Sequence, residues 1–337
     1  MENKLNISLS PHIHGGRSTK RLMWMVVAAM VPALLVALWT FGIPALIVTL
    51  VCVGSCLLTE WIISRFVMRR QEVTIFDGSA LITGLLLAFN LPSILPWWMA
   101  VIGSVVAIGI GKMSFGGLGC NIWNPALVGR VFLLLSFPAA MTTWPGGVDL
   151  GANLFEAATG ATMSADGATG ATLLTTMKMS PDAHLDPDYL GMMIGNMNGS
   201  LGEVGSFAIL LGALFLICTK VITWHIPVAV LGSAAFFSWV FGGNPIIDLF
   251  AGGLMLGACF MATDYVTSPM TPKGMLIYGI LIGFITIVIR RFGSYPEGVS
   301  FAILLMNSFT PLINRYCRPK SFGEKERLEM AKANAKN

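Results

Sequence analysis

The chain has 337 residues, of which 55% are hydrophobic and only 11% are charged, and its formal net charge is +4. Soluble proteins carry about 25% charged residues, so this composition excludes an ordinary soluble globular protein. The mean hydropathy of +0.74 is typical of a protein that loses most of its surface to lipid.

Ten apolar segments follow one another along the chain, each with about the length that crosses a bilayer core of roughly 30 Å. Lipid offers the backbone no hydrogen-bond partners, so such segments are predicted to be helices. They are residues 22–41, 43–64, 78–90, 97–111, 122–139, 204–221, 225–242, 249–264, 274–290 and 298–314. The sequence therefore predicts an all-α polytopic membrane protein with about ten transmembrane helices.

The third and eighth segments are short for a complete crossing. They end in NLPSILP (90–96) and DYVTSPMTP (264–272), where prolines remove backbone donors and break the helix. A weak repeat also relates FGGLGCNIWNPALVGRVFLLLSF (115–137) to FGSYPEGVSFAILLMNSFTPLI (292–313). With five segments in each half, the two repeats would be inverted in the membrane, as in many ion and solute pathways.

Basic residues set the predicted orientation, since cytoplasmic loops are enriched in Lys and Arg. If the N-terminus is cytoplasmic, ten crossings place all but four of the 21 basic residues inside; the four are Arg130, Lys178, Arg290 and Arg291. Both termini are therefore predicted to be cytoplasmic, and no removable signal peptide is expected. The predicted regions are a cytoplasmic N-terminal segment (1–21), a first membrane repeat (22–139), an extracytoplasmic loop (140–203), a second membrane repeat (204–314) and a cytoplasmic basic tail (315–337).

The predicted extracytoplasmic loop is long compared with the other connections, and loops of this length are usually functional or disordered. It carries seven acidic residues against one basic residue, Lys178. One interpretation is a solvated acidic loop with no special role. The other depends on the stretch DGATGATLLTT (166–176), which is too small and polar to pack a core.

Four ionisable residues lie near membrane depth, where a charge is costly and often functional: Glu60, Asp77, Arg130 and Asp264. Glu60 and Asp77 could simply lie at the cytoplasmic interface, whereas Arg130 lies within a span and needs a partner. Asp264 lies at a helix break beside Thr263, Thr267 and Ser268, whose oxygens suit a small cation. We therefore predict an ion path near Asp264, Thr263 and, at the other break, Asn90; the alternative for Asp264 is an interfacial residue without a role.

The six cysteines contain no C-x-x-C pair, which argues against an iron–sulfur cluster held by this chain alone. Cys52 and Cys56 are four residues apart on one helical face, and packing as small apolar side chains is favoured over a metal site. No catalytic residue and no metal ligand is predicted.

Several stretches resemble the D subunit of the Rnf electron-transport complex. They include SPHIHGGRSTKRLMWMVVAAMVPALL (10–35) and NPALVGRVFLLLSFPAAMTTWP (124–145). The stretch DGATGATLL (166–174) is similar to the family's flavin-attachment pattern of Asp, two residues, Ser or Thr, then Gly-Ala-Thr and an apolar pair. The related B subunit of sodium-pumping NADH:quinone reductase shares this pattern but typically has a longer N-terminal region.

The resemblance implies covalent FMN, attached through a phosphoester to Thr172 by a flavin transferase outside the cytoplasm. Asp166, Thr169, Gly170 and Ala171 would form the attachment motif. It also implies a second, non-covalent flavin such as riboflavin within the helices, although no residue of this sequence indicates its position.

The implied function is that of a membrane subunit in a ferredoxin:NAD oxidoreductase complex that exports sodium or protons across the bacterial cytoplasmic membrane. Such a subunit is not catalytic alone, and its partners would include iron–sulfur subunits and a second flavin-bearing subunit, with no nucleic acid. The alternatives are the flavinylated subunit of a sodium-pumping NADH:quinone reductase, a solute channel or carrier of inverted-repeat type, and a structural membrane subunit whose motif is unused.

Overall fold

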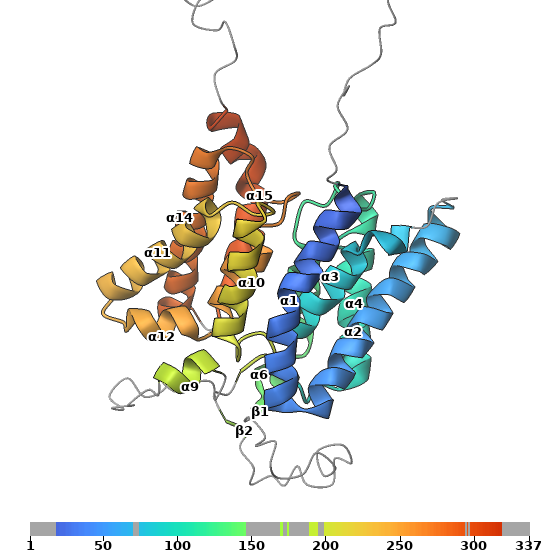
Figure 1. Ribbon diagram of the computed structural model, residues 1–337, viewed down its shortest axis with the longest axis horizontal. Coiled ribbons are helices and arrows are strands. Elements are labelled where there is room, and N and C mark those ends of the chain that lie inside the picture. The colour runs from blue at the N-terminus through green and yellow to red at the C-terminus, as the bar shows by residue number, and fades with distance from the viewer. Residues whose placement is uncertain are drawn as a thin grey trace, which may run out of the picture.

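The computed structural model of the chain describes residues 18–69, 74–145, 169–170, 174, 189–194, 199–293, 295 and 297–318. This part of the chain is almost entirely helical, and its strands are the two short segments β1 (Trp144–Pro145) and β2 (Thr169–Gly170). The helices form two groups side by side, one from each half of the chain (Figure 1). The all-α class is confirmed for these residues.

The first half begins with two helices whose ends follow from local sequence. The Ser18 hydroxyl accepts a hydrogen bond from the Arg21 amide at 3.2 Å and caps the first helix. Gly42, with φ of 64°, makes the turn into the second, a conformation that glycine adopts at no steric cost. The elements are α1 (Thr19–Phe41), α2 (Ile43–Ile62) with its π-helical turn η1 (Ile63–Val67), the short turn η2 (Thr74–Asp77), α3 (Ser79–Phe89), α4 (Trp97–Gly109), the short turn η3 (Met113–Phe115), α5 (Pro125–Ser136) and α6 (Pro138–Thr142).

The second half is interrupted where the eighth apolar segment was predicted. Gly252 and Gly253, with φ of 75° and 64°, separate two short helices there, and the second helix continues into a π-helical turn. The elements are α9 (Tyr189–Ile194), α10 (Ser206–Cys218), α11 (His225–Val240), α12 (Pro245–Phe250), α13 (Leu254–Leu256), η4 (Gly257–Met261), α14 (Pro272–Phe292) and α15 (Val299–Tyr316).

Each of the ten predicted segments contains helix, and four helical stretches are long and apolar enough to cross a membrane: Thr19–Phe41, Ile43–Val67, Trp97–Phe115 and Pro272–Phe292. Shorter apolar helices accompany them, namely α3, α5, α10 and α11. These features are those of a polytopic membrane protein.

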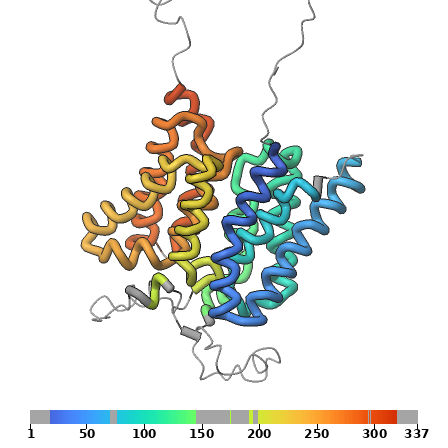
Figure 2. Tube along the Cα trace, in the orientation of Figure 1, coloured from blue at the N-terminus to red at the C-terminus, as the bar shows by residue number. Residues whose placement is uncertain are grey.

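The two halves share one apolar core. Helix α1 packs against α10, and α5 packs against α15, so each half contributes helices to the contact (Figure 2). Backbone hydrogen bonds join the halves where α3 ends: the Gly202 amide donates to the Phe89 carbonyl at 2.7 Å. The outer surface is also apolar, with Leu35, Trp39 and Leu50 more than half exposed, as expected of helices that face lipid.

The start of α1 and the end of α15 lie at one end of the molecule, and β1, β2 and α9 lie at the opposite end (Figure 1). We call these the termini end and the loop end. Most of the predicted loop at 140–203 and both termini lie outside the described residues.

We expect the close approach of α1 and α10 to depend on Gly212. A Cβ atom there would overlap the Ala29 carbonyl oxygen and lie 3.0 Å from Phe260. Overpacking of this kind costs about 1–3 kcal/mol, so Gly212→Ala should lower the thermal unfolding temperature in detergent. The matched change Gly232→Ala, at a helical glycine with open space around it, should not. Equal stability of the two variants would contradict this account of the interface.

Candidate functional site

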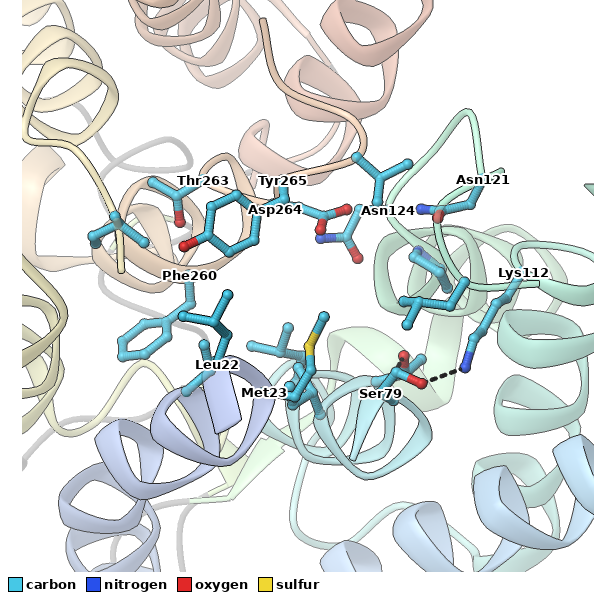
Figure 3. Close-up of a pocket in the computed structure, with 18 of the residues that line it drawn as sticks. Leu22, Met23, Ser79, Lys112, Asn121, Asn124, Phe260, Thr263, Asp264 and Tyr265 are labelled. Carbon is cyan, nitrogen blue, oxygen red and sulfur yellow. Dashed lines mark hydrogen bonds between the residues drawn. The ribbon is translucent and has the colours of Figure 1, made fainter. Parts of the chain in front are cut away.

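A pocket lies between the two halves near the start of α1 (Figure 3). Its walls come from α1, α3, the segment 112–125, and the loop 263–266 that follows η4. Water-sized molecules have about 90 Å³ available in it, which is room for several, because one needs roughly 10–15 Å³ on such a measure. Among largely apolar neighbours, its polar lining residues are Ser79, Thr83, Lys112, Asn121, Asn124, Thr263 and Asp264.

Two of the three predicted ion-path residues, Thr263 and Asp264, line this pocket. Asp264 is half-buried, and its carboxylate accepts a hydrogen bond from the Thr267 hydroxyl at 3.2 Å. Figure 3 shows the Asp264 carboxylate next to the Asn124 side chain, across the pocket from Ser79. The break after η4 and the segment before α5 thus present carboxylate, hydroxyl and amide oxygens to one space, and hard cations prefer such ligands.

Lys112 lines the same pocket and is paired. Its ammonium group lies 2.6 Å from the Glu60 carboxylate and donates to the Ser79 hydroxyl at 2.7 Å (dashed line in Figure 3). The Lys112 and Glu60 side chains are 3% and 1% exposed, so this ion pair is buried within the protein. Lys112 follows α4, so the ion pair joins the end of α2 to the segment after α4, and the hydrogen bond to Ser79 adds the start of α3.

The third predicted ion-path residue, Asn90, lies outside the residues that line the pocket. Its amide nitrogen donates to the Leu86 carbonyl at 2.6 Å and approaches the Met261 sulfur at 3.7 Å. Asn124 donates to the Met261 carbonyl at 3.2 Å. The breaks after α3 and η4 therefore meet at Met261, while Asp264 lies farther along the second break.

At the loop end, Arg130 has the partner that its position in a span requires. Its guanidinium contacts the Glu297 carboxylate and the Ser300 hydroxyl. The Arg130 and Glu297 side chains are 7% and 9% exposed, so this ion pair is buried. Because α5 carries Arg130 and the other two residues lie at the start of α15, the contact joins the two halves.

Arg290 and Arg291, two exceptions to the predicted charge distribution, both contact one acid. Arg290 lies 3.5 Å and Arg291 2.9 Å from the two carboxylate oxygens of Asp248, which also accepts from the Ser238 hydroxyl at 2.5 Å. Arg290 and Asp248 are almost completely buried. One buried acid thus pairs with both arginines.

Sequence reasoning missed four residues as site residues: Lys112, Asp248, Glu297 and Glu203, whose carboxylate accepts a hydrogen bond from the Gly252 amide. All four are buried. The available signal was a charge beside a helix end in an otherwise apolar region, but no pattern indicated which charge would pair with which.

The flavin-attachment stretch is described only in part. Thr169 and Gly170 form β2, which pairs antiparallel with β1 in the register Thr169–Pro145 and Gly170–Trp144. Leu174 is buried. Asp166, Ala171 and Thr172 lie outside the described residues, so the predicted attachment remains a prediction.

The cysteines behave as small apolar side chains. Cys52 and Cys56 are 0% exposed, and each belongs to a cluster of buried apolar residues. Among the described residues, no group of three His, Cys, Asp or Glu side chains could hold a metal ion.

Comparison with known proteins connects these features to a family. Residues 6–323 match the family described as NQR2, RnfD, RnfE. The chain is 43% identical to the D subunit of the Na⁺-translocating ferredoxin:NAD⁺ oxidoreductase complex of Acetobacterium woodii, over 98% of this chain and 99% of that protein. It is 41% identical to the D subunit of the proton-translocating ferredoxin:NAD⁺ oxidoreductase complex of Clostridium ljungdahlii, over 96% and 97%. It is 40% identical to the D subunit of the ion-translocating oxidoreductase complex of Shigella boydii, over 95% and 99%.

We expect Glu297→Ala to destabilise the protein strongly, because it leaves the buried Arg130 without its acidic contact. Removing one partner of a buried pair costs about 3–5 kcal/mol, whereas replacing both by apolar residues is often neutral. The double variant Arg130→Met/Glu297→Leu should therefore recover much of the thermal stability lost by the single variant. Arg65→Met, which changes an exposed basic residue, is the control, and a Glu297→Ala protein as stable as this control would contradict the interpretation.

Proposed function

Because the chain belongs to the NQR2, RnfD, RnfE family, we propose that it carries covalent FMN on Thr172 and conducts ions through the pocket between its halves. It is a membrane subunit of an ion-translocating oxidoreductase complex, the kind of assembly named for its relatives. The relatives named for ferredoxin and NAD⁺ favour that reaction over NADH:quinone reduction, and a plain solute channel would not need the attachment motif.

The proposed complex couples electron flow between reduced ferredoxin and NAD to the export of sodium or protons. This sequence has neither nucleotide-binding nor cluster-binding motifs, so partner subunits with iron–sulfur clusters and flavins would bind both electron carriers. Moving one charge against 100 mV costs about 2.3 kcal/mol, which one electron falling through a similar potential difference can supply.

The observation that carries the flavin proposal is the position of the attachment stretch. Thr169 and Gly170 of this stretch lie in β2 at the loop end, opposite the start of α1 and the end of α15 (Figure 1). With cytoplasmic termini, the loop end faces outward, where the proposed transferase would act. The glycine and alanine before Thr172 give an enzyme close access to the backbone, and a tether keeps the redox group at high local concentration near its partners.

The pocket beside Asp264 would be the inner entrance of the ion path. Its oxygen-bearing side chains and its room for several water molecules suit a partly hydrated small cation. At the loop end, the buried Arg130–Glu297 contact joins the halves, so the described conformation would be open toward the termini end and closed toward the outside. Redox changes would then shift the broken helices between inward-open and outward-open states.

The order of elements supports the proposed inverted repeat. Helix α2 packs against α4 and α4 against α5, while α11 packs against α14 and α14 against α15. Each half also has a buried ion pair beside the end of a helix: Glu60–Lys112 lies where α2 ends, and Asp248–Arg290 lies where α14 ends. The first pair lies beside the start of α3 near the termini end and the second at the loop end, as inverted repeats would place them. On this proposal the short helices contribute to ten crossings.

A second, non-covalent flavin such as riboflavin remains part of the proposal. Acid or solvent extraction of the purified chain would release a non-covalent flavin and leave the covalent one in the protein. Chromatography of the extract identifies the released species.

Thr172→Ala should abolish covalent flavin, detected as flavin fluorescence of the denatured protein in a gel. Gly-Ala-Thr occurs three times, ending at Thr162, Thr169 and Thr172. Of these three threonines, only Thr172 has Asp six residues before it, whereas Thr162 has Glu156 at that position. The extra methylene of Glu displaces the carboxylate by about the length of one bond. Such a displacement is enough to prevent recognition at a site where groups must be positioned to within about 1 Å. Thr162→Ala, the control, should keep the flavin. Peptide mass mapping of the adduct to Thr162, or to both threonines, would show the attachment proposal to be wrong.

Asp264→Asn should reduce ion transport while the covalent flavin and the assembled complex are kept. The change removes the charge and preserves the size, and a loss of about 1.4 kcal/mol in ion binding lowers affinity tenfold. The measurement is redox-driven uptake of sodium or of protons by the complex in proteoliposomes, each followed separately to identify the ion. Asp77→Asn is the matched control, because Asp77 does not line the pocket. Unchanged transport by the assembled Asp264 variant would leave Asp264 with no part in the ion path.

A further inference from the structure

Leu174, two residues after the proposed attachment site, is buried in a small cluster apart from the main core. It is 8% exposed and packs with Met192 of α9, with Ile247 of α12 and with Ala251, which directly follows α12. These neighbours are themselves 4%, 2% and 1% exposed. A leucine held in this way gains about 1.5–3 kcal/mol over an exposed one, which is enough to hold a short polar segment in place.

Gly252 lies directly against the Leu174 side chain in this cluster. A Cβ atom at this position would lie 2.5 Å from the Leu174 Cδ1 atom and 2.6 Å from an Arg290 nitrogen. Gly252 also has φ of 75°, a conformation that other residues rarely adopt. Glycine is therefore required at position 252 for two reasons: the backbone conformation there, and the space that the Leu174 side chain occupies. We call Met192, Ile247, Ala251 and Gly252 the leucine socket.

Buried charges hold the leucine socket in shape. The Gly252 amide donates to the Glu203 carboxylate. Arg290 donates to the carbonyl oxygens of Ala251 and Gly252 at 2.9 and 3.2 Å. Residues from before α10, from the α12–α13 break and from α14 thus converge beneath one side chain of the loop, and hydrogen bonds to charged groups contribute about 1.5–3 kcal/mol each.

A second contact holds the same stretch from the other side. Thr169 and Gly170 pair with β1, which directly follows α6 of the first half. Leu174 contacts α12 of the second half. Between Gly170 and Leu174 are three residues, and the middle one is Thr172. Thr172 is therefore two residues from each of these contacts in the sequence.

We propose that Leu174 is a positioning residue that docks the flavin-bearing stretch in the leucine socket and so holds the FMN at the loop end between the two halves. This inference rests on the proposed attachment of FMN to Thr172. The role of Leu174 is to limit the motion of the tether, and it makes no contact with the electron carriers of partner subunits. Without this contact, the stretch keeps its pairing with β1 but loses its attachment to the second half.

The test compares Leu174→Ala and Ile247→Ala, which empty the leucine socket from its two sides, in the purified full-length chain in lipid nanodiscs. Ile246→Ala is the matched control, because this neighbouring isoleucine of α12 is 47% exposed. Fluorescence of the denatured chain in a gel reports flavin attachment. Time-resolved anisotropy of the covalent flavin in the native chain reports its mobility independently of enzymatic activity.

We expect both socket variants to keep the covalent flavin and to lose most of the slowly decaying anisotropy, while the control matches the unaltered chain. Anisotropy unchanged in Ile247→Ala would overturn the proposal. Loss of flavin from Leu174→Ala together with unchanged anisotropy in Ile247→Ala would also overturn the proposal. That result would indicate that the flavin transferase recognises Leu174. If Leu174→Ala loses its flavin but the flavin of Ile247→Ala becomes mobile, docking is supported. Absence of covalent flavin from the unaltered chain would instead refute the proposed attachment.

Discussion

Charged side chains that are cut off from water must be paired, and this requirement shapes both ends of the molecule. Glu60 holds Lys112 near the termini end, and Asp248 holds Arg290 at the loop end. The partners lie 52 and 42 residues apart in the chain. An unpaired charge in such surroundings costs several kcal/mol, so each pair favours the arrangement of helices that brings its members together. These charges lie at or beside helix ends, so each pair connects helices near their ends.

Much of the helical framework could be predicted from sequence, because hydropathy and proline act locally. The length of an apolar segment limits where a helix can run, and the prolines after Asn90 end α3 where the sequence indicated. The need of Arg130 for a partner was also predictable, since a guanidinium within a span is costly wherever the chain folds. Even Asp264 could be placed beside hydroxyl groups, because Thr263 and Thr267 are its neighbours in the chain.

The rest depends on contacts between distant segments, which local patterns do not encode. Nothing near Glu297 in the sequence indicates Arg130 as its partner. At the division of the eighth segment, a Cβ atom on Gly252 would overlap Leu174 and Arg290, two residues that are distant in the sequence. Asn90 was grouped with Asp264 because both lie at breaks. In the structure the Asn90 amide nitrogen approaches the Met261 sulfur, so the two breaks meet at an apolar side chain that offers no oxygen.

The pairing of β2 with β1, together with the burial of Leu174, has a mechanical consequence. The chain from Gly170 to Leu174 advances four residues, and a fully extended chain spans at most about 14 Å over that length. Its two attachment points belong to different halves of the molecule. This segment therefore limits how far the two halves can separate at the loop end. A larger separation requires that β2 dissociate from β1 or that Leu174 leave the leucine socket. The extent of motion would then be limited by the covalent length of five residues.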